Sequence, residues 1–96
     1  MPDLEVKFFW MEDSSPQDAA YDFPVNSSLS SVKTKYATQR SLDPGRVTCY
    51  PMNAGESAND AQEAVLSNRR QPVNPREALT TSIDLFVVIK PTGKSH

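Results

Sequence analysis

The sequence predicts an α+β domain in which a mixed sheet of about four strands packs on one main helix. Two observations lead to this fold class. Apolar residues alternate with other residues in Leu4 to Met11, and a second segment rich in β-forming residues runs from Ser82 to Lys90. Between them, Leu29, Val32 and Tyr36 recur at helical spacing. Because 96 residues is the length of one domain, we expect residues 1–96 to fold as a single unit.

The first two strands are expected to form a long hairpin. The strand from Leu4 to Met11 is followed by a polar stretch, EDSSPQD, with a central proline. Alternation resumes at Ala19 and continues to Val25. This second strand contains Pro24, whose missing N–H is tolerated mainly at a sheet edge. We therefore place it at the edge.

The main helix is expected to begin near Ser28 and to span about ten to twelve residues. Asn26 to Ser28 offers capping side chains, and we interpret its match to a glycosylation sequon in the same way. The LDPG segment, 42–45, should end the helix region and turn the chain, because proline cannot continue a helix. Arg46 to Tyr50, rich in β-forming residues, is then expected to be a short third strand.

The segment 51–81 has the weakest pattern and is expected to be long and irregular. Asn59 to Leu66 could form a short helix capped by Ser57. Alternatively, residues 64–66 form a strand that turns into residues 71–73. Pro75 is expected to start a single helical turn that ends near Leu79. The strand from Ser82 to Lys90 is apolar on both faces and should therefore be central in the sheet.

This order of elements resembles ubiquitin and the wider β-grasp superfold, in which the last strand lies beside the first and runs parallel to it. Residues 29–36 look like the ubiquitin helix, 42–50 like the loop and strand that follow, and 82–89 like the closing strand. The resemblance implies one ubiquitin-like domain with a longer segment at 51–81. The sequence ends Pro-Thr-Gly-Lys-Ser-His, without the Gly-Gly that conjugation of a modifier requires, so we expect no conjugation.

Composition argues against several classes of function. The net charge is −2, the pI is near 5.2 and the ten basic residues are scattered, so we expect no nucleic-acid partner. No apolar stretch approaches the ~20 residues that cross a bilayer, and we expect no membrane partner. With three glycines there is no phosphate-binding loop, and no cofactor is expected. One cysteine, Cys49, and no signal peptide predict an intracellular setting, cytoplasm or nucleus.

Catalytic chemistry finds no support in the residue types. His96 is the only histidine and is the last residue of the sequence. Cys49 has no histidine to activate it and is expected to be a small buried side chain. The twelve carboxylates show no paired spacing for acid–base chemistry or metal binding. We therefore expect no enzyme and no metal site, and we interpret the acidic stretch from Glu12 to Asp22 as a solvated hairpin.

The candidate functional feature is the sheet face opposite the main helix. Strand parity places Trp10 toward the helix, where we expect it to be buried against Leu29 or Val32. The same parity turns a second set of side chains outward on neighbouring strands. This candidate protein-binding set is Phe9, Met11, Thr48, Tyr50, Phe86 and Val88.

Two explanations of this apolar set remain open, because leaving such side chains in water is costly. Either a partner covers the face, or the segment 51–81 folds back over it with Val65, Leu66, Val73 and Leu79. The function predicted is a non-catalytic protein-interaction module of ubiquitin-like fold. The alternative is a small self-contained effector or inhibitor, for example viral, that blocks a larger protein machine. Partner and oligomeric state stay open.

Overall fold

Four strands and two α-helices make up the fold in a computed structural model that describes residues 3–53 and 55–90. The strands are β1 (Leu4–Glu12), β2 (Ser15–Phe23), β3 (Val47–Pro51) and β4 (Ile83–Ile89), and the helices are α1 (Leu29–Gln39) and α2 (Ala58–Leu66). A short 3-10 helix, η1 (Pro44–Arg46), precedes β3.

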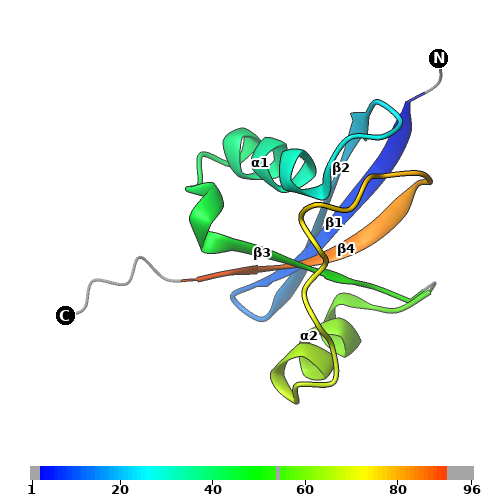
Figure 1. Cartoon of the computed structure of the whole chain (residues 1–96). Helices are drawn as coiled ribbons and strands as arrows, with labels where there is room; N and C mark the ends of the chain where they lie inside the picture. The colour runs from blue at the N-terminus through cyan, green and yellow to red at the C-terminus, as the bar shows by residue number, and fades with distance from the viewer. Residues whose placement is uncertain (1–2, 54, 91–96) are drawn as a thin grey trace.

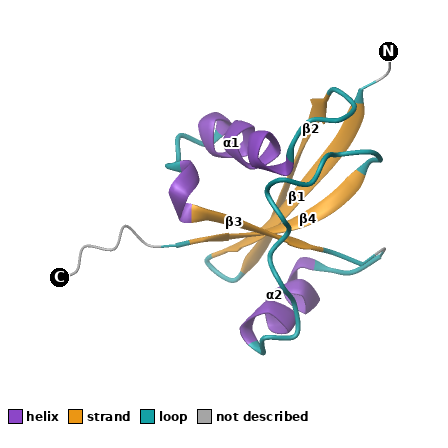
Figure 2. Ribbon diagram, in the orientation of Figure 1, coloured by secondary structure: helices purple, strands orange, loops and turns teal. Residues whose placement is uncertain are grey.

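The sheet has the order β2-β1-β4-β3. β1 is antiparallel to β2 and parallel to β4, and β3 is antiparallel to β4. The helix α1 lies over one face and α2 lies on the other side of the sheet (Figure 1, Figure 2). The predicted α+β class, the edge position of the second strand and the central position of the last strand are confirmed.

The β1–β2 hairpin is tighter than predicted. Glu12 pairs directly with Ser15, so the turn consists of Asp13 and Ser14 alone. Both have positive φ, 51° and 66°, and a turn of this handedness matches the twist of the strands it joins. The expected polar loop over 12–18 is therefore wrong, and the second strand runs from Ser15 to Phe23 instead of Ala19 to Val25. Pro24, on which the edge prediction rested, lies just after the strand. The proline within the strand is Pro16, which is compatible with an edge position.

The helix α1 begins where predicted. The Ser28 hydroxyl accepts a hydrogen bond from the Ser31 N–H at 3.1 Å, which caps the first turn. Four α1 side chains are buried against the sheet and form the main core with β1 and β4. They are Leu29, Val32, Tyr36 and Ala37.

Trp10 is buried, as predicted, with 7% of its surface exposed. Its ring packs against the Tyr36 ring at 5.5 Å between centroids, and the Arg40 guanidinium lies 4.3 Å above it. Tyr36 and the C-cap residue Arg40 come later in the chain than Leu29 and Val32, against which the prediction had placed Trp10. Trp10 is near the C-terminal end of β1, and that end of the strand lies against the C-terminal half of the helix.

The segment between β3 and β4 is more regular than predicted. The short-helix prediction is confirmed by α2, whose N-cap Ser57 accepts a bond from the Asp60 N–H at 3.2 Å, and the rival strand is wrong. The helical turn predicted from Pro75 to Leu79 is wrong. The chain makes one turn, with the Glu77 N–H bonded to the Asn74 carbonyl, and then runs extended beside Ser27 and Ser28.

The third strand, β3, is shifted by one residue from the predicted Arg46 to Tyr50, because Arg46 belongs to η1. Within residues 3–53 and 55–90, no helix has the length and hydropathy needed to cross a membrane.

Candidate functional site

The sheet face opposite α1, here called the outer face, carries a second apolar cluster. Phe86 is at its centre and is only 2% exposed. Phe9, Met11, Tyr50 and Val88 pack around it and are partly buried, as strand parity predicted.

The outer face is covered by α2. Three alanines one turn apart, Ala58, Ala61 and Ala64, are 4%, 0% and 7% exposed, and the first two pack in the cluster with Phe86. Alanine lets the helix approach closely because it has no side chain beyond Cβ. Of the two explanations for this face, the structure therefore favours cover by the segment 51–81.

The side chains that provide this cover differ from those predicted. Val65 packs against the cluster, but Leu66 points to solvent and is 77% exposed. Val73 and Leu79 pack with the core on the α1 side. The reason is helical geometry, since a stripe of alanines at 58, 61 and 64 turns residue 66 away from the sheet.

An apolar groove of about 210 Å³ remains where the cover ends. The parallel ladder between β1 and β4 stops at the pair Phe9–Phe86, so the two strands separate beyond it. One side of the groove is therefore the end of β1 and the other is α2. Its lining consists of Trp10, Met11, Gln62, Val65, Leu66, Phe86, Val87, Val88 and Ile89.

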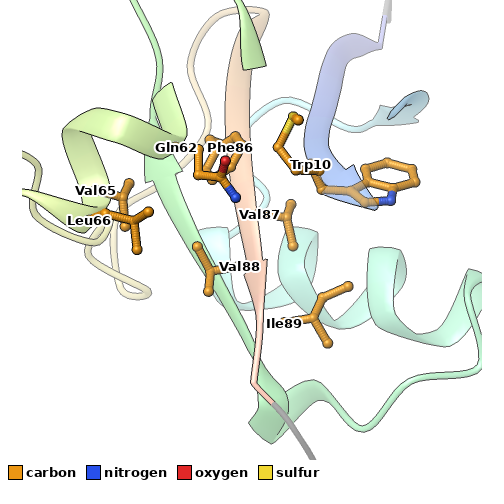
Figure 3. Close-up of a pocket in the computed structure, with 9 residues that line it drawn as sticks. Trp10, Gln62, Val65, Leu66, Phe86, Val87, Val88 and Ile89 are labelled. Carbon is orange, nitrogen blue, oxygen red and sulfur yellow. The ribbon is translucent and has the colours of Figure 1, made fainter. Parts of the chain in front are cut away.

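β4 lies between the two sides of this groove and contributes lining residues from both of its faces (Figure 3). Val65 and Leu66 of α2 lie on the same side of β4 as Val88, and Trp10 lies on the other side with Val87. The Gln62 side chain is the polar group placed next to Phe86. The groove can therefore accept an aliphatic or aromatic side chain and offers it one amide.

Charges at the Trp10 side of the groove are paired with each other. Arg40 donates a hydrogen bond to the Tyr36 hydroxyl at 3.0 Å and lies 3.5 Å from the Glu12 carboxylate. The Trp10 indole N–H donates to the same carboxylate at 3.3 Å. Burial raises the pKa of the Tyr36 phenol, so the group stays neutral and accepts the bond from Arg40. These contacts hold the Trp10 ring in place.

The six residues predicted as a protein-binding set have different positions relative to the groove. Met11, Phe86 and Val88 line it. Phe9 and Tyr50 belong to the cluster that packs with α2. Thr48 pairs with Val88 across β3 and β4 and is partly exposed.

Sequence reasoning did not assign the α2 wall of the groove to a binding site. Leu66 and Val65 were expected only as cover. The alanine spacing at 58, 61 and 64 was the signal available, because it identifies the buried side of the helix and leaves Leu66 outside it.

The single cysteine is buried in the main core, as predicted. Cys49 is 3% exposed, and burial raises the pKa of its thiol to about 12. His96 lies outside the described residues. Among residues 3–53 and 55–90, no three His, Cys, Asp or Glu side chains are placed to hold a metal ion.

Comparison with solved structures identifies the fold. The N-terminal ubiquitin-like domain in the 4931431F19Rik protein superimposes with a TM-score of 0.63 at 9% identity, over 99% of this chain and 82% of that one. The C-terminal ubiquitin-like domain of mouse tubulin-specific chaperone e gives 0.62 at 11% identity, over 98% and 93%. A Caldiarchaeum subterraneum ubiquitin gives 0.55 at 11% identity, over 96% and 99%.

No protein-family model matches the sequence, and no curated protein matches it. The chain is therefore recognised through its structure, and it has the ubiquitin-like β-grasp fold that the order of its elements predicted.

Proposed function

We propose that this chain is a non-catalytic protein-interaction module of ubiquitin-like fold, not conjugated to other proteins, that binds its partner through the groove between the end of β1 and α2. The observation that supports this proposal is an apolar groove of about 210 Å³ beside Leu66, which is 77% exposed. Fully burying a leucine side chain contributes about 1.5–3 kcal/mol, so a partner that covers it gains that free energy.

The proposed surface retains the reachable part of the predicted set. Met11, Phe86 and Val88 line its floor, and Val65 and Leu66 form the wall. Phe9 and Tyr50 support this floor within the same cluster. Thr48, partly exposed beside Val88 in the sheet, extends the surface across β3. An aliphatic or aromatic anchor from a protein partner fits this lining.

The similar structures favour an interaction module over the alternative, a self-contained effector. Two of the similar structures are, by their names, ubiquitin-like domains of larger proteins. The proposal includes the intracellular setting inferred from the single cysteine. The free, buried thiol of Cys49 is compatible with a reducing compartment.

The test uses a photo-reactive amino acid at position 66, in the full chain expressed in its native cells. The matched control carries the same group at Thr34, an exposed residue on α1. We expect a protein that crosslinks at 66 and not at 34. Its purified form should bind the wild type and Thr34→Asp equally and should bind Leu66→Asp at least tenfold more weakly.

Leu66 is exposed, so Leu66→Asp should melt within about 2–4 °C of the wild type. A loss of binding in this variant would then show that Leu66 is part of the binding surface. A partner that binds Leu66→Asp as tightly as the wild type would refute this surface. Absence of any crosslink at position 66 would count against the module itself.

A further inference from the structure

A bidentate ion pair joins the two ends of the α2 segment. Arg70 donates to the Glu56 carboxylate through both terminal nitrogens, at 2.8 and 2.7 Å. Their side chains are only 15% and 12% exposed. Glu56 lies just before α2 and Arg70 lies shortly after it, so the pair closes a loop around the helix.

The same pair is fastened to the end of β3. Arg70 Nη1 also donates to the Pro51 carbonyl at 2.7 Å. The Glu56 carboxylate accepts a further bond from the Asn53 N–H at 3.1 Å. Because both partners bind the chain where it leaves the sheet, the ion pair determines where α2 can lie.

The helix itself is held by few large side chains. It has nine residues, fewer than the ~12–15 that an isolated helix needs in water. Its buried residues are Ala58, Ala61 and Ala64, whereas α1 buries leucine, valine and tyrosine as well as one alanine. Apolar contact therefore contributes less to holding α2 than to holding α1, and the ion pair carries a larger share.

We propose that the segment from Glu56 to Arg70 is a hinged cover that opens while the sheet and α1 stay folded. The Glu56–Arg70 pair latches it to the end of β3 through its bonds to the Pro51 carbonyl and the Asn53 N–H. The occupant of the outer face is thus the chain's own α2. Opening uncovers Phe86 and the aromatic rings beside it. The use of this motion rests on the proposed function, because an open cover removes the α2 wall of the groove and makes the apolar side chains beneath it accessible to the same partner.

Hydrogen exchange of the full chain, resolved by residue, tests the latch without any partner. The variant is Arg70→Met, and the matched control is Arg69→Met, which removes the same charge from a neighbouring exposed arginine bonded to the Ser67 hydroxyl. A hydrogen bond to a charged group contributes enough that its loss should speed exchange of the α2 amides about tenfold or more. Exchange in β1, β4 and α1 should not change in either variant, and Arg69→Met should leave α2 unchanged.

Two further measurements keep the test decisive if Arg70→Met folds poorly. In the wild type, α2 amides should exchange faster than those of β1 and β4, since the cover opens before the sheet unfolds. Glu56→Gln, which keeps an acceptor but removes the charge, should accelerate α2 less than Arg70→Met does. Equal exchange rates for α2 and β4 in the wild type, or equal acceleration everywhere in Arg70→Met, would overturn the latch. Crosslinking at position 66 would be unaffected by that outcome, so the two proposals can fail separately.

Discussion

Replacing Phe86 by serine tests the cover that distinguishes the two faces of this sheet. Phe86 is 2% exposed and packs with Ala58 and Ala61. Truncating a buried phenylalanine costs about 3–5 kcal/mol, through lost burial and the cavity left behind. The serine hydroxyl adds a further cost unless it finds a hydrogen-bond partner. We expect the free energy of unfolding to fall by at least about 3 kcal/mol, a large part of the roughly 5–14 kcal/mol of a domain this size.

Thermal unfolding, followed by circular dichroism, measures this change. In a domain of this size 1 kcal/mol corresponds to about 4–8 °C, so the melting temperature should fall by at least about 12 °C. Leu66→Ser is the matched control, because Leu66 is on α2, the helix that covers Phe86, and is 77% exposed. It should melt within about 2–4 °C of the wild type. Phe86→Leu should show a smaller, measurable loss if the serine variant does not fold.

A Phe86→Ser protein that melts as the wild type does would contradict the burial of Phe86 under α2. It would mean that α2 does not cover Phe86 in solution and that the outer face is open. The whole predicted set on that face would then be available for direct contact with a partner.

Four further results follow from local contacts. Cys49, whose thiol pKa burial raises to about 12, should resist thiol reagents at pH 8 until the chain is unfolded; rapid labelling of the folded protein would contradict its burial. Ser28→Ala should lower the free energy of unfolding by about 0.5–2 kcal/mol in urea titrations, because the helix loses its cap, and an unchanged midpoint would exclude that role. Trp10 fluorescence should be blue-shifted and protected from iodide, because the ring is buried. Trp10→Ala should lower the free energy of unfolding by about 3–5 kcal/mol. Wild-type stability in that variant would mean that Trp10 does not face the core. The bond from Arg70 lowers the pKa of Glu56 below its ordinary 4.5, so the ion pair stabilises the fold fully above pH 4.5 and less as the pH falls through the lowered pKa. The difference in unfolding free energy between the wild type and Arg70→Met should therefore become smaller from pH 7 to pH 3. A difference that stays constant over this range would show that the charge of Glu56 does not contribute to stability.

Strand periodicity made the sheet predictable from the sequence. Alternation in β1 separates Trp10 from Met11, and the same parity in β4 separates Val87 from Phe86. Side chains of a strand alternate between the two faces of the sheet, so an apolar pattern of period two predicts both the strand and the face that each side chain occupies. The helix α1 was predictable for the same kind of reason, since its cap and its apolar spacing occur within one short stretch.

The geometry of the β1–β2 turn and the direction in which α1 crosses the sheet could not be predicted from such periodic patterns. The polar residues 12–18 have the composition of a loop, yet pairing with β1 extends β2 back to Ser15. Backbone pairing, which composition does not report, overrides that preference. Trp10 was placed in the core by its parity, but which turn of α1 it meets depends on how the helix crosses the sheet.

Local patterns of residues were enough to predict the α+β class, the resemblance to ubiquitin, the central position of β4 and the apolar character of both sheet faces. What covers the outer face, and where the groove remains, follow from how the folded chain packs. The physical reason is that α2 packs through alanines, which carry little hydrophobic signal in a sequence but allow a helix to lie close against Phe86. The ion pair that ties Glu56 to Arg70 joins residues that no local pattern relates, so the position of that helix, and with it the exposure of Leu66, emerges only when the chain is folded.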